Sequence, residues 1–173
     1  MTINRVYIHR GADKFIPEMM MPIKNERYKP KVHTGLWASP VDAEFGWLEW
    51  CEAEQFQTGP LDKSFRFTIR DQDRVLYVHD KETTQELIRK YYIPNTSHIH
   101  DEYDAESICA MIDRTLFLPI INLDFEAMER DGWVGLEINL SEYRPLYWLL
   151  YGWDCDSIVV FSADQVEPEE RME

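Results

Sequence analysis

The segment Leu149-Leu150-Tyr151-Gly152-Trp153-Asp154-Cys155-Asp156-Ser157-Ile158-Val159-Val160-Phe161 places two carboxylates at the start of an apolar strand. Successive strand residues point to opposite faces, so we expect Asp154 and Asp156 on one face and Cys155 on the other. Repulsion between the two acids, together with partial burial, would raise the pKa of at least one of them. Two explanations stay open, a solvated strand end with a capping aspartate or a functional site.

The length and composition predict one folded domain. The chain has 173 residues, of which 45% are hydrophobic and 13% aromatic, so it can bury a substantial core. We expect a single domain over residues 1–166 and a frayed acidic tail over 167–173. The three cysteines are widely spaced and form no C-x-x-C motif, and no apolar run reaches membrane-spanning length. A cytoplasmic protein without a membrane segment or a disulfide framework is therefore expected.

The net charge restricts the partners. A formal charge of −14 and a pI near 4.7 argue against a nucleic-acid groove, because phosphate binding needs a surplus of Lys and Arg. Ordinary solubility accounts for such a charge, and so does mimicry of nucleic acid toward a basic partner. Composition alone does not separate these two interpretations.

The first third of the chain predicts two strands and a helix. Residues Arg5–Arg10 alternate and stop at Gly11, which is typical of a strand, and an irregular segment from Ala12 to Thr34 follows. A short strand over Gly35–Ala38 comes next. The order Ser39-Pro40-Val41-Asp42 then predicts a helix start with a capping hydroxyl and proline in the first turn, continuing to about Glu54.

The remaining patterns alternate between strands and helices. A hairpin is expected across the turn at residues 71–73, Asp80 is expected to cap a helix with Thr84, Leu87, Ile88 and Tyr91 toward the core, and Asn122 is a candidate cap further on. The predicted ranges are strands at 65–69, 75–78, 135–139 and 157–161 and helices at 81–92, 105–115, 123–130 and 145–151. This mixture predicts an α+β domain.

Several common site motifs are missing or weak. His98 and His100, beside Asp101 and Glu102, have residue types that suit zinc, but exposed histidines in a polar loop are the favoured interpretation and no metal is expected. No glycine cluster matches a dinucleotide or phosphate loop, and no hydrolase triad is indicated. The aromatic side chains of Trp47, Trp50, Tyr147, Trp148, Tyr151 and Trp153 suit either core packing or stacking on a planar ligand.

Three short segments together resemble the ADP-ribosyltransferase superfamily. They are the strand ending His9-Arg10-Gly11, the segment Gly35-Leu36-Trp37-Ala38-Ser39-Pro40, and the acidic start of the strand that runs into Ile158-Val159-Val160-Phe161-Ser162-Ala163-Asp164-Gln165. The chain is also similar, over most of its length, to small phage and prophage proteins that carry GLWASP and LYGWDCDS segments. The superfamily resemblance implies a split β-sandwich with flanking helices and a cleft for NAD, which is the substrate.

The resemblance also implies roles for individual residues. Arg10, or alternatively His9, would hold the NAD phosphates or ribose, and only one of them is expected to face the cleft. Gly35 and Trp37 would line the nicotinamide pocket, and Ser39 would position the ribose or the acid. Asp154 and Asp156 fall where the superfamily has its Glu-x-Glu pair, with one acid stabilising the oxocarbenium-like state and the other orienting the acceptor.

Two functions are carried forward from these observations. The first is an NAD-dependent mono-ADP-ribosyltransferase or NAD glycohydrolase, phage-encoded and acting on a protein or nucleic acid of the host. The second is a non-catalytic acidic inhibitor on the same fold that blocks a basic site of a host or defence protein, suggested by the charge and by aspartates one methylene shorter than glutamate. Glu137, alone on a predicted strand, is a rival for the acid; an exposed strand residue is the alternative interpretation.

Overall fold

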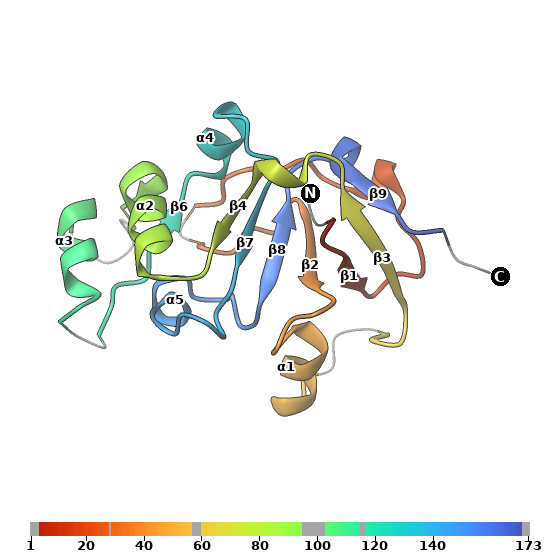
Figure 1. Cartoon of the computed structure of the whole chain (residues 1–173), viewed down its shortest axis with the longest axis horizontal. Helices are drawn as coiled ribbons and strands as arrows, with labels where there is room; N and C mark the ends of the chain where they lie inside the picture. Colours follow the sequence, from red (N-terminus) through yellow and green to blue (C-terminus); the bar gives the residue numbers. More distant parts are fainter. Residues whose placement is uncertain (1–3, 28, 57–59, 95–102, 115–116, 171–173) are drawn as a thin grey trace.

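Seven strands of the computed structural model form one sheet with the order β4-β7-β8-β2-β1-β3-β9 (Figure 1). The structure describes residues 4–27, 29–56, 60–94, 103–114 and 117–170. The strands are β1 (Tyr7–Arg10), β2 (Leu36–Pro40), β3 (Ser64–Ile69), β4 (Val75–Val78), β7 (Gly135–Ile138), β8 (Ser157–Val160) and β9 (Val166–Pro168). A separate two-stranded ribbon pairs β5 (Tyr92–Ile93) with β6 (Asn122–Leu123).

The helices surround this sheet unevenly. They are α1 (Trp47–Ala53), α2 (Lys81–Tyr91), α3 (Ala105–Met111), α4 (Phe125–Arg130) and α5 (Pro145–Leu149), with short 3-10 turns η1 (Pro17–Met19), η2 (Gln72–Arg74) and η3 (Ala163–Gln165). Figure 1 shows α2, α3 and α5 beside the β4 end of the sheet, whereas α1 stands apart beneath β2. The predicted α+β class is confirmed. A division of the strands into a split β-sandwich stays a prediction.

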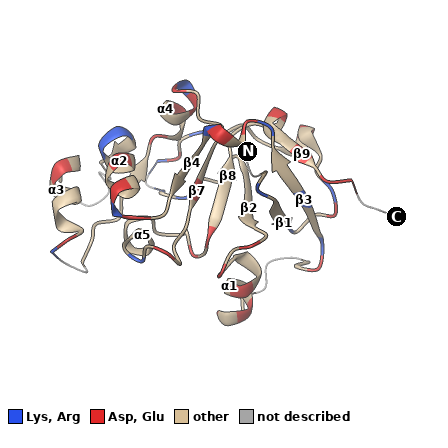
Figure 2. Ribbon diagram, viewed as in Figure 1, with Lys and Arg blue, Asp and Glu red and all other residues tan. Residues whose placement is uncertain are grey.

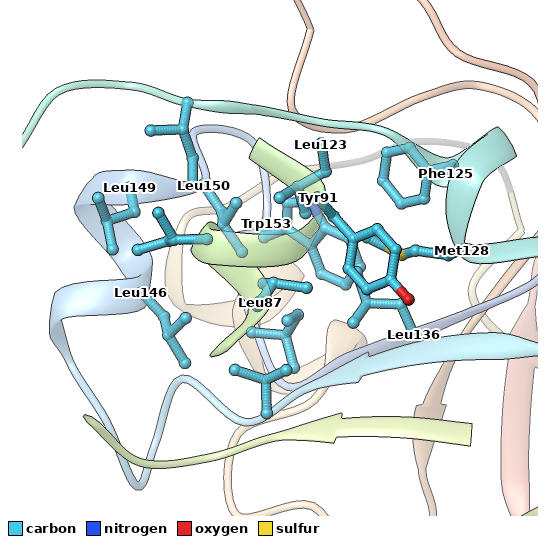
Figure 3. Close-up of a cluster of buried hydrophobic side chains, with 14 of the residues drawn as sticks. Leu87, Tyr91, Leu123, Phe125, Met128, Leu136, Leu146, Leu149, Leu150 and Trp153 are labelled. Carbon is cyan, nitrogen blue, oxygen red and sulfur yellow. The ribbon is translucent and has the colours of Figure 1, made fainter. Parts of the chain in front are cut away.

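Two hydrophobic cores lie on opposite faces of the sheet. Val159 and Leu136 belong to the larger core, under α2, α4 and α5, which Figure 3 shows around Trp153. Ile158 and Val160 belong to the smaller core with Tyr7 and residues of β3. This alternation is the period of two expected for a strand buried on both sides. Strand β8 therefore contributes side chains to both cores, and it lies inside the sheet between β7 and β2.

The predicted helix start at Ser39 and Pro40 is wrong. Both residues continue β2, where Ser39 pairs with Ile8 and Pro40 with Tyr7 of β1. Helix α1 begins only at Trp47, whose backbone N–H donates to Ser39 Oγ over 2.9 Å. Ser39 Oγ thus accepts from the first N–H group of α1, but the N-cap residue of this helix is Gly46.

The predicted hairpin between β3 and β4 is also wrong. Although η2 joins the two strands directly, β3 pairs with β1 and β9, and β4 pairs in parallel with β7. Alternating apolar residues define a strand without specifying its partner, and burial in the two cores decides the pairing.

Other predicted boundaries are close to the observed ones. Asp80 caps α2, whose residues Thr84, Leu87, Ile88 and Tyr91 are buried as expected. Asp124, rather than Asn122, caps α4, because Asn122 belongs to β6. Glu167 and Pro168, expected in a frayed tail, belong to β9, where Glu167 pairs with Thr68.

Candidate functional site

Four of the five residues expected to bind NAD, namely His9, Arg10, Trp37 and Ser39, line one cavity beside β1 and β2. This space, called the Lys31 cavity below, has a volume of about 240 Å³. It is lined by Ile8, His9, Arg10, Lys31, Trp37, Ala38, Ser39, Trp47 and Ser157. Its charged side chains are basic, and no carboxylate lines it among the described residues. In a chain with a charge of −14, this makes the cavity electrostatically distinct.

Lys31 lies between two indole rings. Its Nζ is 4.9 Å from the centroid of Trp37 and 5.2 Å from that of Trp47, within the range of cation–π attraction. Burial lowers the pKa of Lys31, and the nearby Cys155, Asp154 and Cys51 oppose that shift. A cation held in an aromatic, partly desolvated cavity interacts strongly with an anionic ligand.

His9 is held in place by a hydrogen bond to the backbone of β2. Its Nδ1 lies 2.7 Å from the carbonyl oxygen of Trp37, which only accepts hydrogen bonds, so the proton belongs on Nδ1. Burial lowers the pKa of His9, and that hydrogen bond opposes the shift. The ring of His9 also packs against Phe65 at 5.0 Å between centroids. His9 therefore lines the cavity with its Nδ1 fixed to the backbone and with a pKa shifted toward the neutral form.

The expectation that only one of His9 and Arg10 faces the cleft is wrong, because both line the Lys31 cavity. Arg10 is the last residue of β1, where the chain leaves the sheet at Gly11. Its Nη1 donates to the carbonyl oxygen of Leu61 over 3.1 Å, which fixes one side of the guanidinium group. A long side chain at the end of a strand reaches a space that a mid-strand residue would not.

Trp37 and Ser39 form the cavity wall, whereas Gly35 does not. Trp37 packs edge-on against Trp153, with 4.6 Å between the ring centroids. The Nε1 of Trp37 donates a hydrogen bond to none of the described residues. Gly35 has a φ of +78°, and a Cβ there would lie 2.6 Å from Val159 Cγ2. Gly35 is thus required for close packing against β8, and its predicted contact with nicotinamide has no counterpart in the cavity lining.

Asp156 is buried and hydrogen-bonded to two other segments of the chain. It is 3% exposed, its Oδ1 accepts from the Ser141 N–H at 2.9 Å, and its Oδ2 accepts from the Ser141 hydroxyl at 2.6 Å and the Phe45 N–H at 3.4 Å. Its own N–H donates to the Phe45 carbonyl at 2.9 Å. These bonds join three segments of the chain, so both oxygens of this carboxylate already serve the fold.

Asp154 is the more accessible acid of the pair. It is half-buried, and burial raises its pKa, an effect that Lys31 opposes and Glu54 reinforces. Asp154, Cys155 and Asp156 all line one further cavity of about 460 Å³. The two acids thus share a side as expected, but the expected separation of Cys155 from them is wrong, because β8 begins only at Ser157 and all three residues precede the strand.

Cys155 lines the same cavity as the two acids but not the Lys31 cavity. Its Sγ lies 3.2 Å from Ser157 Oγ, and burial raises the pKa of the thiol to about 11. A thiol with that pKa is protonated at neutral pH and is a poor nucleophile. The acids and the cofactor residues expected in one cleft thus lie in two neighbouring cavities.

Glu137 is buried, not exposed, although it lies alone on β7. It is 2% exposed; Tyr7 Oη donates to its Oε2 over 2.7 Å, and Arg5 Nη1 lies 2.8 Å from its Oε1. Burial raises the pKa of Glu137, while Tyr7 and Arg5 oppose the shift and Asp42 and Asp156 reinforce it. A buried, partly neutralised carboxylate of this kind is found at functional sites and also in structural ion pairs.

Sequence reasoning missed Lys31 and Arg5. Lys31 follows Pro30 in an irregular segment with no motif around it, so no local signal identifies it. His98 and His100 lie outside the described residues. Within the described parts of the chain, no cluster of three or more His, Cys, Asp or Glu side chains is arranged to hold a metal ion. No helix there combines the length and the apolar character needed to span a membrane.

Comparisons with known proteins add no relative. No protein-family model, no curated protein sequence and no solved structure matches this chain.

Proposed function

We propose that the Lys31 cavity binds a nucleotide of the NAD type and that the protein is an ADP-ribosyltransferase-like enzyme acting on a macromolecule of a host cell. The observation that carries the proposal is one cavity lined by Lys31, Arg10 and His9, with Lys31 Nζ between the indoles of Trp37 and Trp47. Cations suit phosphate oxygens, and indole faces suit a planar base. The three matched segments of sequence and the α+β class agree with a split β-sandwich of that superfamily.

The size of the site suits half of a dinucleotide. The Lys31 cavity has about 240 Å³, whereas pockets for whole drug-sized ligands span roughly 300–1,000 Å³. A neighbouring cavity of about 130 Å³ shares Arg10, Ser39 and Trp47 and adds Arg66 and Glu49. The nicotinamide mononucleotide half would fit the Lys31 cavity, and the second phosphate would reach toward Arg66.

The chemistry assigned to the site is cleavage of the bond between the ribose C1′ and nicotinamide. The bonding electrons leave with neutral nicotinamide, C1′ bonds to an acceptor oxygen or nitrogen, and the acceptor loses its proton. Asp154 is the carboxylate that best fits stabilisation of the positive charge on the ribose, because it is half-exposed and close enough to Lys31 for their charges to interact. Ser39 and His9 would orient the ribose.

Calorimetric titration with NAD tests the proposal directly. Wild type is expected to bind NAD and to release nicotinamide, and Lys31→Met and Arg10→Gln are each expected to weaken binding about tenfold or more. Lys24→Met is a matched control, because Lys24 lies in the same irregular segment as Lys31 but is exposed and does not line the Lys31 cavity. If wild type binds neither NAD nor ADP-ribose, or if Lys24→Met weakens binding as much as Lys31→Met does, the nucleotide site is refuted.

A second candidate function is a non-catalytic acidic protein that blocks a basic site of a partner. It is favoured by the separation of the acids from the Lys31 cavity and by the complete use of Asp156 in hydrogen bonds. NAD binding without release of nicotinamide, with and without host lysate, would favour this candidate over the enzyme.

A further inference from the structure

Three adjoining cavities form an acidic track that shares no lining residue with the Lys31 cavity. Their volumes are about 460, 250 and 500 Å³. The first and second share Glu44, Ser141 and Asp156, and the second and third share Arg5, Asp42, Glu137 and Glu142. The track therefore continues from Trp148 on α5 to Tyr77 on β4.

The charge of this track is strongly negative. Two arginines, Arg5 and Arg144, face seven carboxylates, those of Asp42, Glu44, Glu54, Glu137, Glu142, Asp154 and Asp156. Arg5 is already occupied, since it pairs with Glu137 at 2.8 Å and with Asp42 at 3.5 Å. Figure 2 shows acidic segments on α1 and in the loops near the lower end of the sheet. Carboxylates gathered along a hollow focus the field on a cationic ligand.

Buried polar atoms at the Glu137 end have unused hydrogen-bonding capacity. Oε1 of Glu137 is close to Arg5 but accepts no hydrogen bond from the described residues, because the ion pair lacks hydrogen-bond geometry. The Oε1 of Gln72 likewise accepts none. Both residues line the third cavity. Glu137 Oε1 is held by its ion pair with Arg5, whereas Gln72 Oε1 has no donor among the described residues and could accept from an N–H group of a ligand.

Aromatic side chains line the other end of the track. Tyr147 is 46% exposed and Trp148 53% exposed, and both border the first cavity with Phe45 and Trp50. Large exposed aromatic residues beside carboxylates are suited to guanidinium and ammonium groups, which stack on a ring while they pair with an acid. An apolar surface of this kind marks an interaction site more often than a solvated face.

From these observations we infer that the acidic track docks an extended basic segment of a partner protein, with successive Arg or Lys side chains entering the three cavities. A small cation would occupy only one of the three cavities. Because neighbouring cavities share lining residues, a peptide of several residues could occupy all three. A nucleic acid is repelled by the same carboxylates. The inference does not depend on nucleotide binding, although Asp154 borders the track and lies near Lys31.

Fluorescence anisotropy with a labelled eight-residue Arg-Gly peptide tests the inference. Wild type is expected to bind this peptide and to ignore an Asp-Gly peptide of equal length. The double variant Glu44→Gln/Glu142→Gln is expected to weaken binding about tenfold, because it removes two charges along the track. The matched control is Glu18→Gln/Glu129→Gln, which removes the same charge from exposed positions on η1 and α4 and is expected to bind within about twofold of wild type.

Three outcomes would overturn the inference: no binding of the peptide by wild type, equal weakening by the two double variants, or binding of spermidine as tight as that of the peptide. The second would show attraction to net charge alone, and the third a small-cation site. Trp148→Ala checks the aromatic end and is expected to weaken binding severalfold. NAD titration of the same variants keeps the two proposals separate, because the track variants leave every residue of the Lys31 cavity in place.

Discussion

The hydroxyl of Tyr7 on β1 donates a 2.7 Å hydrogen bond to Glu137 on β7, although β8 and β2 lie between these strands. The sheet therefore curves enough for side chains of nonadjacent strands to meet in the smaller core. Gln72, whose Nε2 donates to the same hydroxyl at 2.9 Å, adds η2 to this contact. A buried network of this kind specifies one arrangement of strands.

Removal of the Tyr7 hydroxyl should destabilise the protein. Tyr7→Phe leaves Oε2 of Glu137 buried without its donor, and we expect a loss of about 1–3 kcal/mol in the free energy of unfolding. Urea denaturation followed by circular dichroism measures this loss. Tyr147→Phe is the control, because that hydroxyl is on an exposed residue. Equal stability of Tyr7→Phe and wild type would contradict the prediction.

Glu137 should give stability a distinct pH dependence. Its pKa is raised in the folded state above the ordinary 4.5, so the folded protein binds the proton more tightly than the unfolded chain does. The stability contributed by this group is full below pH 4.5 and is lost as the pH rises toward the raised pKa. Glu137→Gln should flatten that part of the profile in urea denaturation at stepped pH, and an unchanged slope would contradict the assignment.

His9 should give the free energy of unfolding a pH dependence opposite to that from Glu137. Burial lowers the pKa of His9 below 6.5, so the unfolded chain binds the proton more tightly. Stability from the neutral ring is present above pH 6.5 and declines as the pH falls through the lowered pKa. In His9→Asn this decline should be smaller than in wild type. His33→Asn serves as the control, since His33 is exposed.

Alanine substitutions at Gly35 and Gly132 should distinguish the cost of steric crowding from the cost of a strained backbone. Both have positive φ, +78° and +92°, but an added Cβ would collide with Val159 and Val160 only at Gly35. Gly132→Ala should lose roughly 1–2 kcal/mol from the left-handed backbone alone. Gly35→Ala should lose about 2 kcal/mol more, because overpacking adds to the strain. Thermal unfolding of the two variants gives the difference, and similar values would mean that β8 yields to the added methyl.

The two aspartates should respond differently to amide substitution. Asp156→Asn replaces a carboxylate oxygen that accepts a hydrogen bond by an NH₂ group, and we expect a loss of about 1–3 kcal/mol in stability. Asp154→Asn should leave the free energy of unfolding nearly unchanged while it lowers nicotinamide release. Chemical denaturation and a nicotinamide assay on both variants test this contrast. If Asp156→Asn folds normally and alone abolishes release, the roles are reversed.

The fold could be predicted where its signals are local. Asp80 caps α2 through Thr83, three residues away, and the buried face of α2 follows from helical spacing. Strand pairing is not local. The parallel pairing of Val75 with Gly135 joins residues 60 positions apart, and nothing in either segment specifies the other.

The candidate site shows the same division. His9, Arg10, Trp37 and Ser39 could be singled out because short strand motifs contain them, and the structure brings them to one cavity. Lys31 could not, because its place between two indoles depends on how an irregular segment crosses the sheet. The burial of Asp156 depends on Ser141 and Phe45, which come from two other parts of the chain.

The position of β8 has a consequence for how the molecule is made. This strand, Ser157–Val160, lies between β7 and β2, and β9 at Val166–Pro168 then covers the edge of β3. A nascent chain on the ribosome therefore has β2 and β7 without the strand that joins them until nearly all of the described sequence has emerged. Stop codons before residue 157 should yield aggregation-prone fragments rather than a smaller folded protein. Both cores would lack the side chains of β8, and the edges of β7 and β2 would stay unpaired.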